Sequence, residues 1–297
     1  MLQPLIEAGL RQTMNHLVRP ILTPAVPIRV QRALTRQAYR SSVPPRGCRF
    51  SHGTLAGVPV VRTSCGKQQD GVILYLHGGG FIIGSADTHR GITGHLAKAS
   101  QCLVVTPDYR LAPEHPFPAA LDDAEATYLQ LLAEGYAPDQ IALAGDSAGG
   151  GLCVSLAMHL RDNQQPLPSS LTLFSPWTDL TQEQLYQPES EPVLQPAWTA
   201  KAAKLYAGDQ SLKDPLISAV FGDLKGLPPL LIQVGSDEIL LNDAERLARV
   251  AKRDRVPVNL EIYNSLWHVF QVHSGQLDRA TEAMRTAGDH IRAHLTN

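Results

Sequence analysis

Ser147 is the residue of this chain best suited to act as a nucleophile, because it lies in the pentapeptide Gly-Asp-Ser-Ala-Gly at 145–149. An apolar, strand-like run at 141–144 precedes the motif and a helix-compatible stretch follows it, which is the context of a nucleophile elbow. In such an elbow the strand and the helix nearly touch, so Gly145 and Gly149 leave out side chains that would clash. The motif therefore predicts a reactive serine hydroxyl on a tight turn.

A second glycine-rich stretch predicts a place for negative charge. Gly78, Gly79 and Gly80 follow His77 at the end of another apolar run. Glycines present their N–H groups without obstruction, so Gly79 and Gly80, with the N–H of Ala148, are expected to form an oxyanion hole. No Gly-Lys-Ser/Thr follows, which argues against phosphate binding. His77 and Gly78 are expected to support the loop.

A serine nucleophile needs a histidine base and a carboxylate that orients it. On a strand–turn–helix scaffold of this kind, the acid and then the histidine follow the serine in the chain. Asp237 follows the apolar run 230–234, and His268 follows the alternating run 258–263. Both therefore end neighbouring strand-to-loop connections, and the predicted triad is Ser147, Asp237 and His268.

Alternatives remain open for two of these three positions. Glu238 adjoins Asp237 and would serve as the acid if the turn were shifted by one residue. His273, five residues beyond His268, is the rival base. Asp146 is not expected to be the acid, because on the tight turn it faces away from the nucleophile and bonds local donors instead.

Three motifs in order carry a family resemblance: His-Gly-Gly-Gly at 77–80, Asp-Tyr-Arg-Leu-Ala-Pro-Glu-His-Pro-Phe-Pro-Ala-Ala at 108–120, and Gly-Asp-Ser-Ala-Gly-Gly at 145–150. Together they resemble the hormone-sensitive-lipase family of α/β-hydrolases, in its bacterial, family IV type of esterase. The resemblance runs from about residue 70 to the C-terminus. It implies a serine carboxylesterase acting on short to medium acyl chains, with the oxyanion hole on the second and third glycines and on Ala148.

The sequence departs from the family pattern at two places near the predicted triad. The family usually has glycine after the catalytic histidine, where this chain has Val269, and Asp-Pro-Leu where this chain has Asp-Glu-Ile at 237–239. The first change is expected to reshape the pocket. The residues expected to line the substrate pocket are Phe81, Trp198, Tyr206 and Val269.

Strand-like runs alternate with helical patterns along most of the chain, which predicts an α/β-hydrolase fold with a mostly parallel, doubly wound sheet. The first strands, close in sequence, can pair antiparallel. The expected strands are 57–62, 72–76, 102–106, 141–144, 171–174, 230–234 and 259–263. We expect one domain over 1–297, with a catalytic core from about 46–179 and 216–297 and a helical cap from about 1–45 and 180–215.

The first fifty residues are strongly basic, with eight arginines and one acid, Glu7. A basic arm raises the question of nucleic-acid or membrane-surface binding. However, Ile6, Leu10, Met14 and Leu17 recur at helical spacing between the arginines. An amphipathic helix packed on the body is therefore favoured, and no nucleic-acid partner is expected.

Composition limits the classes of protein to which this chain can belong. The chain has 297 residues, 43% of them hydrophobic, and a formal charge of −2. The four cysteines show no paired spacing and are expected to be thiols in a reducing, cytoplasmic compartment. They are Cys48, Cys65, Cys102 and Cys153. No apolar run is long enough to span a membrane, and no signal-peptide pattern opens the chain.

The expected partner is a small ester, with no metal and no organic cofactor, and the last helix or the adjacent edge strand offers a surface for a homodimer. A lipase would need a larger apolar entrance. An amidase would share the same triad. A non-catalytic binding protein on this scaffold would be expected to have lost a triad member.

Overall fold

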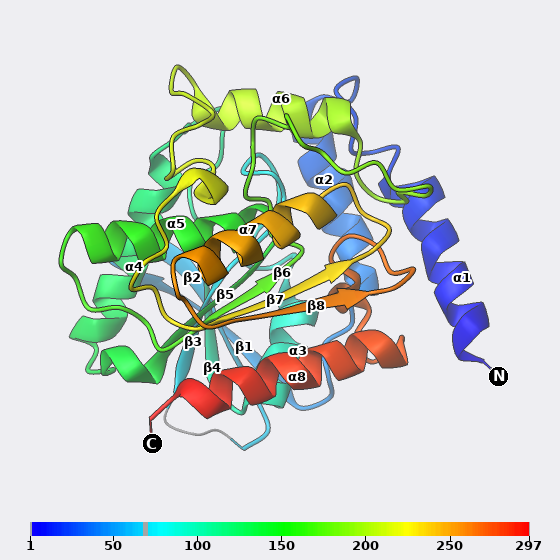
Figure 1. The fold of residues 1–297 in the computed structure, drawn as a ribbon. Coiled ribbons are helices and arrows are strands. Elements are labelled where there is room, and N and C mark those ends of the chain that lie inside the picture. Colours follow the sequence, from blue (N-terminus) through cyan, green and yellow to red (C-terminus); the bar gives the residue numbers. More distant parts are fainter. Residues whose placement is uncertain (1, 68–70, 297) are drawn as a thin grey trace.

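A single eight-stranded sheet forms the centre of the computed structural model, which describes residues 2–67 and 71–296 (Figure 1). The strand order is β1-β2-β4-β3-β5-β6-β7-β8. The strands are β1 (Cys48–Leu55), β2 (Val58–Cys65), β3 (Val72–Leu76), β4 (Leu103–Pro107), β5 (Ile141–Asp146), β6 (Leu171–Phe174), β7 (Leu230–Gly235) and β8 (Val258–Tyr263). The β1–β2 and β2–β4 pairs are antiparallel and the other five are parallel, which confirms the predicted α/β architecture.

Eight α-helices surround this sheet in the part of the chain that the structure describes. They are α1 (Gln3–Thr13), α2 (Ile28–Ala38), α3 (Arg90–Ser100), α4 (Ala119–Ala133), α5 (Ala148–Asp162), α6 (Pro196–Ala207), α7 (Leu241–Arg253) and α8 (Asp278–His294). Among the residues described, none of these helices has the length and apolar content needed to traverse a lipid bilayer.

The alternation of side chains along the strands divides the core in two. On β3, Leu74 and Leu76 belong to the cluster that contains side chains of α4, α5 and α7, whereas Ile73 and Tyr75 belong to the cluster with α3 and α8. Successive side chains of a strand point to opposite faces, so helices cover both sides of the sheet. This explains why the central strands read as continuous apolar runs.

The remaining three helices cover the functional end of the sheet. In Figure 1, α1 and α2 (blue) lie at the end to which the arrows of β7 and β8 point, and α6 (yellow-green) lies above them. Trp198 of α6 donates its indole N–H to Gln31 of α2, at 2.7 Å. The two segments, more than 150 residues apart in the chain, thus meet through a buried hydrogen bond.

The N-terminal helix departs from the expected register at its end. After α1, a π-helical turn, η1 (Met14–Val18), replaces the last α-helical turn. A π turn contains one more residue than an α turn, so the apolar stripe moves along by one position. Met14 is buried as expected, but Leu17 is 65% exposed and Val18 faces the cavity described below. The expectation that Leu17 packs on the body was wrong.

Strand β1 was missed in the sequence because it is mostly exposed and polar, with a glycine in its middle. It forms a hairpin with β2 through Ala56 and Gly57, both at positive φ (48° and 85°). Two such residues make the tight turn whose twist suits a hairpin. Gly57 therefore belongs to the turn and not to a strand.

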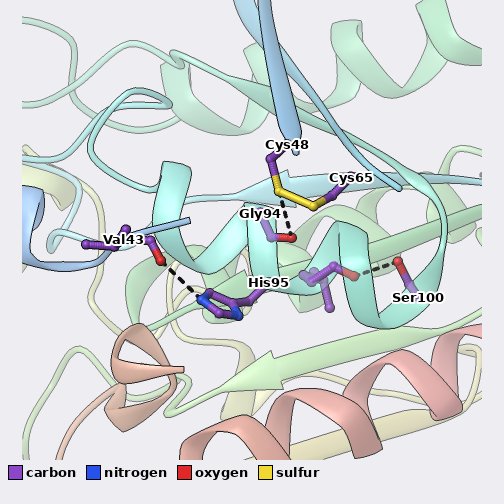
Figure 2. The surroundings of a disulfide bond; sticks show 7 residues. Val43, Cys48, Cys65, Gly94, His95 and Ser100 are labelled. Atoms are coloured by element: carbon purple, nitrogen blue, oxygen red, sulfur yellow. Dashed lines mark hydrogen bonds between the residues drawn. A yellow bond between two sulfur atoms is a disulfide. The ribbon is translucent and has the colours of Figure 1, made fainter. Parts of the chain in front are cut away.

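Cys48 and Cys65 form a disulfide, which contradicts the expectation of four thiols. They face each other at the open end of the β1–β2 hairpin, as register partners seventeen residues apart. Figure 2 shows the bond against α3, where the Cys48 sulfur lies 3.7 Å from the Gly94 carbonyl oxygen. Cys102 and Cys153 are free and buried. Sequence spacing did not reveal the pair because the missed strand β1 brings Cys48 into place.

Candidate active site

Ser147 lies on a sharp turn between β5 and α5. Its φ and ψ are 53° and −120°, a conformation that costs a non-glycine residue about 1–3 kcal/mol. A Cβ atom on Gly149 would lie 2.0 Å from the Leu76 carbonyl oxygen, so no larger residue fits there. The close approach of helix and strand holds the strained turn, as the elbow motif predicts.

The Ser147 hydroxyl belongs to a buried relay of three side chains. Its Oγ lies 2.9 Å from His268 Nε2, and His268 Nδ1 lies 2.6 Å from an Oε of Glu238. A carboxylate can only accept, so Nδ1 carries the proton and Nε2 accepts the serine hydroxyl. The three residues follow β5, β7 and β8, whose carboxyl ends meet at one edge of the sheet.

The carboxylate in this relay is Glu238, so the prediction of Asp237 was wrong. Glu238 is fully buried, and its second oxygen accepts the Gly235 N–H and the Ser175 hydroxyl, each at 2.7 Å. Asp237 points the other way, towards Arg11, and its side chain is 26% exposed. The turn after β7 is shifted by one residue from the predicted turn. This shift is the alternative under which Glu238 serves as the acid.

The imidazole that contacts Ser147 is that of His268, and no contact joins the rival His273 to Ser147. His273 lies in a 3₁₀ turn and its ring packs against Trp267. It also lines the cavity next to the serine. Burial lowers the pKa of His273 to about 4, so it is neutral at physiological pH.

Charge around His268 favours the protonated imidazole. Burial alone disfavours the charged form, but the hydrogen bond and the charge of Glu238, with Glu191 and Asp146, together raise the pKa of His268 above its usual value. The site is therefore built to stabilise the imidazolium that forms when the base takes a proton.

Glu191 is a functional residue that sequence reasoning missed. One of its oxygens accepts the N–H groups of Val193 and Leu194, and the other accepts that of Ile239, at 2.7 to 3.0 Å. Burial raises its pKa, despite these bonds and the nearby His268. It ties the segment before α6 to the residue after Glu238. No sequence signal marks it, since a glutamate in a proline-rich stretch is typical of a solvated loop.

The glycine loop faces the serine as predicted. Gly79 and Gly80 line the same cavity as Ser147 and His268, and both have positive φ (117° and 59°). Ala148 is the first residue of α5, where N–H groups have no acceptor within the helix. The Gly78 N–H is not available, because it donates to Asp146 at 3.0 Å.

Asp146 and His77 stabilise the glycine loop through hydrogen bonds with Gly78. Asp146 is buried and accepts bonds from Gly78 and from the Tyr75 hydroxyl, as expected for a residue facing away from the nucleophile. His77 Nδ1 donates to the Gly78 carbonyl at 2.8 Å, and its ring stacks on Tyr109 at 4.1 Å. Burial lowers the pKa of His77 to about 3, so it is a neutral structural residue.

A small cavity of about 80 Å³ opens onto Ser147. Trp198 and Val269 line it, as predicted, together with apolar side chains from η1 and α2. Phe81 and Tyr206 do not line it, so their assignment to its wall was wrong. They are buried and stack on each other with ring centroids 3.6 Å apart. Among the described residues, no group of three or more histidines, cysteines or acids could hold a metal ion.

Val269 occupies a backbone conformation that favours glycine. Its φ and ψ are 51° and 43°, in the left-handed region that β-branched residues rarely adopt. Its N–H donates to the Ser175 hydroxyl at 3.0 Å, and Ser175 in turn donates to Glu238. The residue after the base is thus held by the same hydroxyl that supports the acid.

Comparison with known proteins agrees with this geometry. A family model for the α/β-hydrolase fold matches residues 73–272. A crystal structure of an esterase from the bacterial hormone-sensitive lipase family has a TM-score of 0.90 with this chain and is 36% identical, covering 99% of this chain and 98% of its own. This chain belongs to the hormone-sensitive-lipase family of α/β-hydrolases.

Two other similar proteins place this α/β-hydrolase among enzymes. An acetyl-hydrolase of Streptomyces hygroscopicus is 41% identical over 229 residues, which are 76% of this chain and 77% of the relative. A crystal structure of EstE5, soaked with p-nitrophenyl butyrate, is 36% identical with a TM-score of 0.90, over 97% of this chain and 98% of that one.

The relay predicts different effects for two adjacent carboxylates of this hydrolase. Glu238→Gln should slow the reaction of Ser147 with phenylmethylsulfonyl fluoride by about 10³-fold, because an amide no longer fixes the histidine tautomer. Asp237→Asn, the matched control, should slow it no more than about tenfold. Mass spectrometry of Ser147 modification gives both rates. A larger loss in Asp237→Asn than in Glu238→Gln would contradict the relay.

Glu191 should set the pH dependence of the same reaction. His268 must be neutral to act as a base, so the rate falls as pH drops below its raised pKa. Glu191→Gln removes a negative charge that favours the imidazolium, so the acid limb should move to lower pH. The rate at the plateau should also fall, because the imidazolium formed in the transition state is less stabilised. An acid limb that stays in place would contradict this role.

Proposed function

We propose that this chain is a serine carboxylesterase that hydrolyses esters of short to medium acyl chains through an acyl-enzyme intermediate. The observation that carries the proposal is the unbroken relay from Glu238 through His268 to Ser147, opening onto a small apolar cavity. An acetyl-hydrolase relative and an EstE5 crystal soaked with p-nitrophenyl butyrate support the same reaction class.

In the proposed mechanism, His268 takes the proton of Ser147 as the hydroxyl oxygen attacks the ester carbonyl. Glu238 holds the imidazole with Nδ1–H towards it and stabilises the imidazolium. The carbonyl oxygen becomes an oxyanion, which accepts bonds from the N–H groups of Gly79, Gly80 and Ala148. Loss of one such donor typically costs about 3–4 kcal/mol of transition-state stabilisation.

The intermediate then collapses and the alcohol leaves with the proton that His268 returns. A water molecule takes the alcohol's place, gives its proton to His268 and attacks the acyl carbon. The second tetrahedral intermediate releases the acid and restores Ser147. Every proton transfer passes through one imidazole nitrogen, Nε2, so the reaction needs no other titrating group.

Substrate size is set in this proposal by a cap formed from about 1–45 and 180–215. Met14 and Val18 from its first part and Trp198 from its second line the cavity. Trp198 lies so close to the oxyanion loop that a Cβ on Gly80 would come within 2.9 Å of its ring. The closed wall favours short acyl chains over the long chains of a lipase substrate.

A cytoplasmic location and a homodimer stay predictions. The Cys48–Cys65 disulfide is typical of proteins from oxidising compartments, and it removes the argument from unpaired cysteines. Size-exclusion chromatography with light scattering, and alkylation of thiols at the moment of cell lysis, address the two points.

The substrate class is tested with p-nitrophenyl esters from acetate to palmitate, a long-chain triglyceride and an anilide. We expect the highest kcat/KM at short acyl chains and only traces of activity on the triglyceride and the anilide. Ser147→Ala should remove turnover and leave the circular dichroism spectrum unchanged. Ester hydrolysis that persists in Ser147→Ala, or a preference for palmitate or the anilide, would overturn the proposal.

Trp198 should control the acyl-chain preference. Trp198→Ala removes a ring from the cavity wall, so the optimum should move to longer chains and kcat/KM for acetate should fall about tenfold. Trp198→Phe is the matched control, because it keeps a ring in the wall and removes only the bond to Gln31. An unchanged chain-length profile in Trp198→Ala would show that the ring does not bound the acyl chain.

A further inference from the structure

We infer that Arg11, on the N-terminal helix α1, is a positioning residue that holds the loops of the acid and the base in place. The inference rests on the proposed ester hydrolysis. It goes beyond the relay because Arg11 touches none of the three catalytic side chains. It also assigns a role to Asp237, the carboxylate that lies next to the relay without joining it.

One guanidinium group bridges α1 to three separate loops. Arg11 Nη2 forms an ion pair with Asp237 at 2.8 Å and donates to the Ser265 carbonyl oxygen. Nη1 donates to the Ser190 hydroxyl at 3.2 Å. The group also lies over the Trp267 ring, 5.3 Å from its centroid. Four residues from three loops thus share one cation.

Each of these loops carries a buried group of the site. Asp237 directly precedes Glu238, Trp267 precedes His268, and Ser190 precedes Glu191. Arg11 therefore contacts the residue directly before Glu238 and the residue directly before His268. The loops of Asp237 and Ser265 also bond to each other through the Ser236 hydroxyl, and Arg11 adds the tie to the cap.

We expect Arg11 to act by holding the loops in position rather than through its charge. The Arg11 and Asp237 side chains are 21% and 26% exposed, so solvent screens their charges and the ion pair alone adds little to stability. The planar guanidinium, however, has five donors in a fixed fork, which serve several acceptors while its face stacks on an indole. A lysine ammonium cannot reproduce this arrangement.

The contacts of Arg11 matter for catalysis because the relay tolerates little displacement of its three side chains. His268 makes a short 2.6 Å contact with Glu238 and a 2.9 Å contact of ordinary length with Ser147, and small misplacements of reacting groups lower rates steeply. The contacts of Arg11 should therefore keep the acid and the base aligned. Rates should respond to Arg11 even though it does not line the cavity at Ser147.

The test uses chemical rescue. The ion pair lines an open groove beside α1, so a small cation can reach it. In Arg11→Ala we expect kcat for p-nitrophenyl acetate to fall about tenfold with KM changed less than about twofold. Guanidinium chloride at millimolar concentration should restore several-fold of the lost kcat, whereas sodium chloride at the same concentration and Arg11→Lys should not.

Two variants separate positioning from mere stability. Glu7→Gln is the matched control, since Glu7 pairs with Arg279 at 3.5 Å and reaches the Ser265 loop only indirectly, through the bond of Arg279 to the Asn264 carbonyl oxygen, and it should keep wild-type kcat. Asp237→Asn should lower kcat by no more than Arg11→Ala does, because its amide oxygen can still accept from Arg11, and the double variant should be no worse than Arg11→Ala alone, because the contact of Asp237 with α1 runs through Arg11.

The inference is overturned if Arg11→Ala keeps its kcat, if guanidinium gives no more recovery than sodium chloride, or if the Arg11 and Asp237 effects simply multiply. The same variants are also compared in the rate of Ser147 modification by phenylmethylsulfonyl fluoride. If the wild-type protein hydrolyses no ester, the proposed function fails, while this modification rate still reports whether Arg11 aligns the relay.

Discussion

A buried carboxylate beside an imidazole is the constraint on which the rest of this site depends. A charge without solvent is costly unless hydrogen bonds surround it, and Glu238 has partners from β7, from Ser175 and from His268. Satisfying those partners fixes the turn after β7 and the loop after β8. The order of the parallel strands then brings both loops to the serine. The sheet topology therefore brings together the groups that surround one buried carboxylate.

The helices that cover the relay meet the same requirement. Imidazole and carboxylate interact strongly only where water is excluded, and α1, η1, α2 and α6 provide that cover. Their contacts with the body are specific rather than merely apolar. Arg32 on α2, for example, donates to the carbonyl oxygens of Ile82 and Ala112 and pairs with Glu114. Arg32 and Trp198 thus lie against the segment that begins at the glycine loop, and Glu191 contacts the residue after Glu238.

The parts of this structure that were predictable from the sequence are those that a local pattern determines. The elbow at Ser147 and the glycine loop are short motifs whose glycines have a steric reason, and His268 follows a clear strand. Glu238 could not be separated from Asp237, because a one-residue shift in a turn decides which carboxylate turns inward. The role of Glu191, the π turn at η1 and the Cys48–Cys65 pair depend on tertiary contacts that no local pattern records.

Val269 shows how closely stability and selectivity are linked in this fold. A valine in the left-handed region stores about 1–3 kcal/mol of unfavourable backbone energy, and its side chain narrows the space next to the base. Glycine at that position would release the stored energy and enlarge the cavity, but it would also remove a valine side chain that is 5% exposed and packs in the core. A substitution at this one position therefore changes the stability of the fold and the size of the cavity together, so an evolving lineage cannot alter either property here without altering the other.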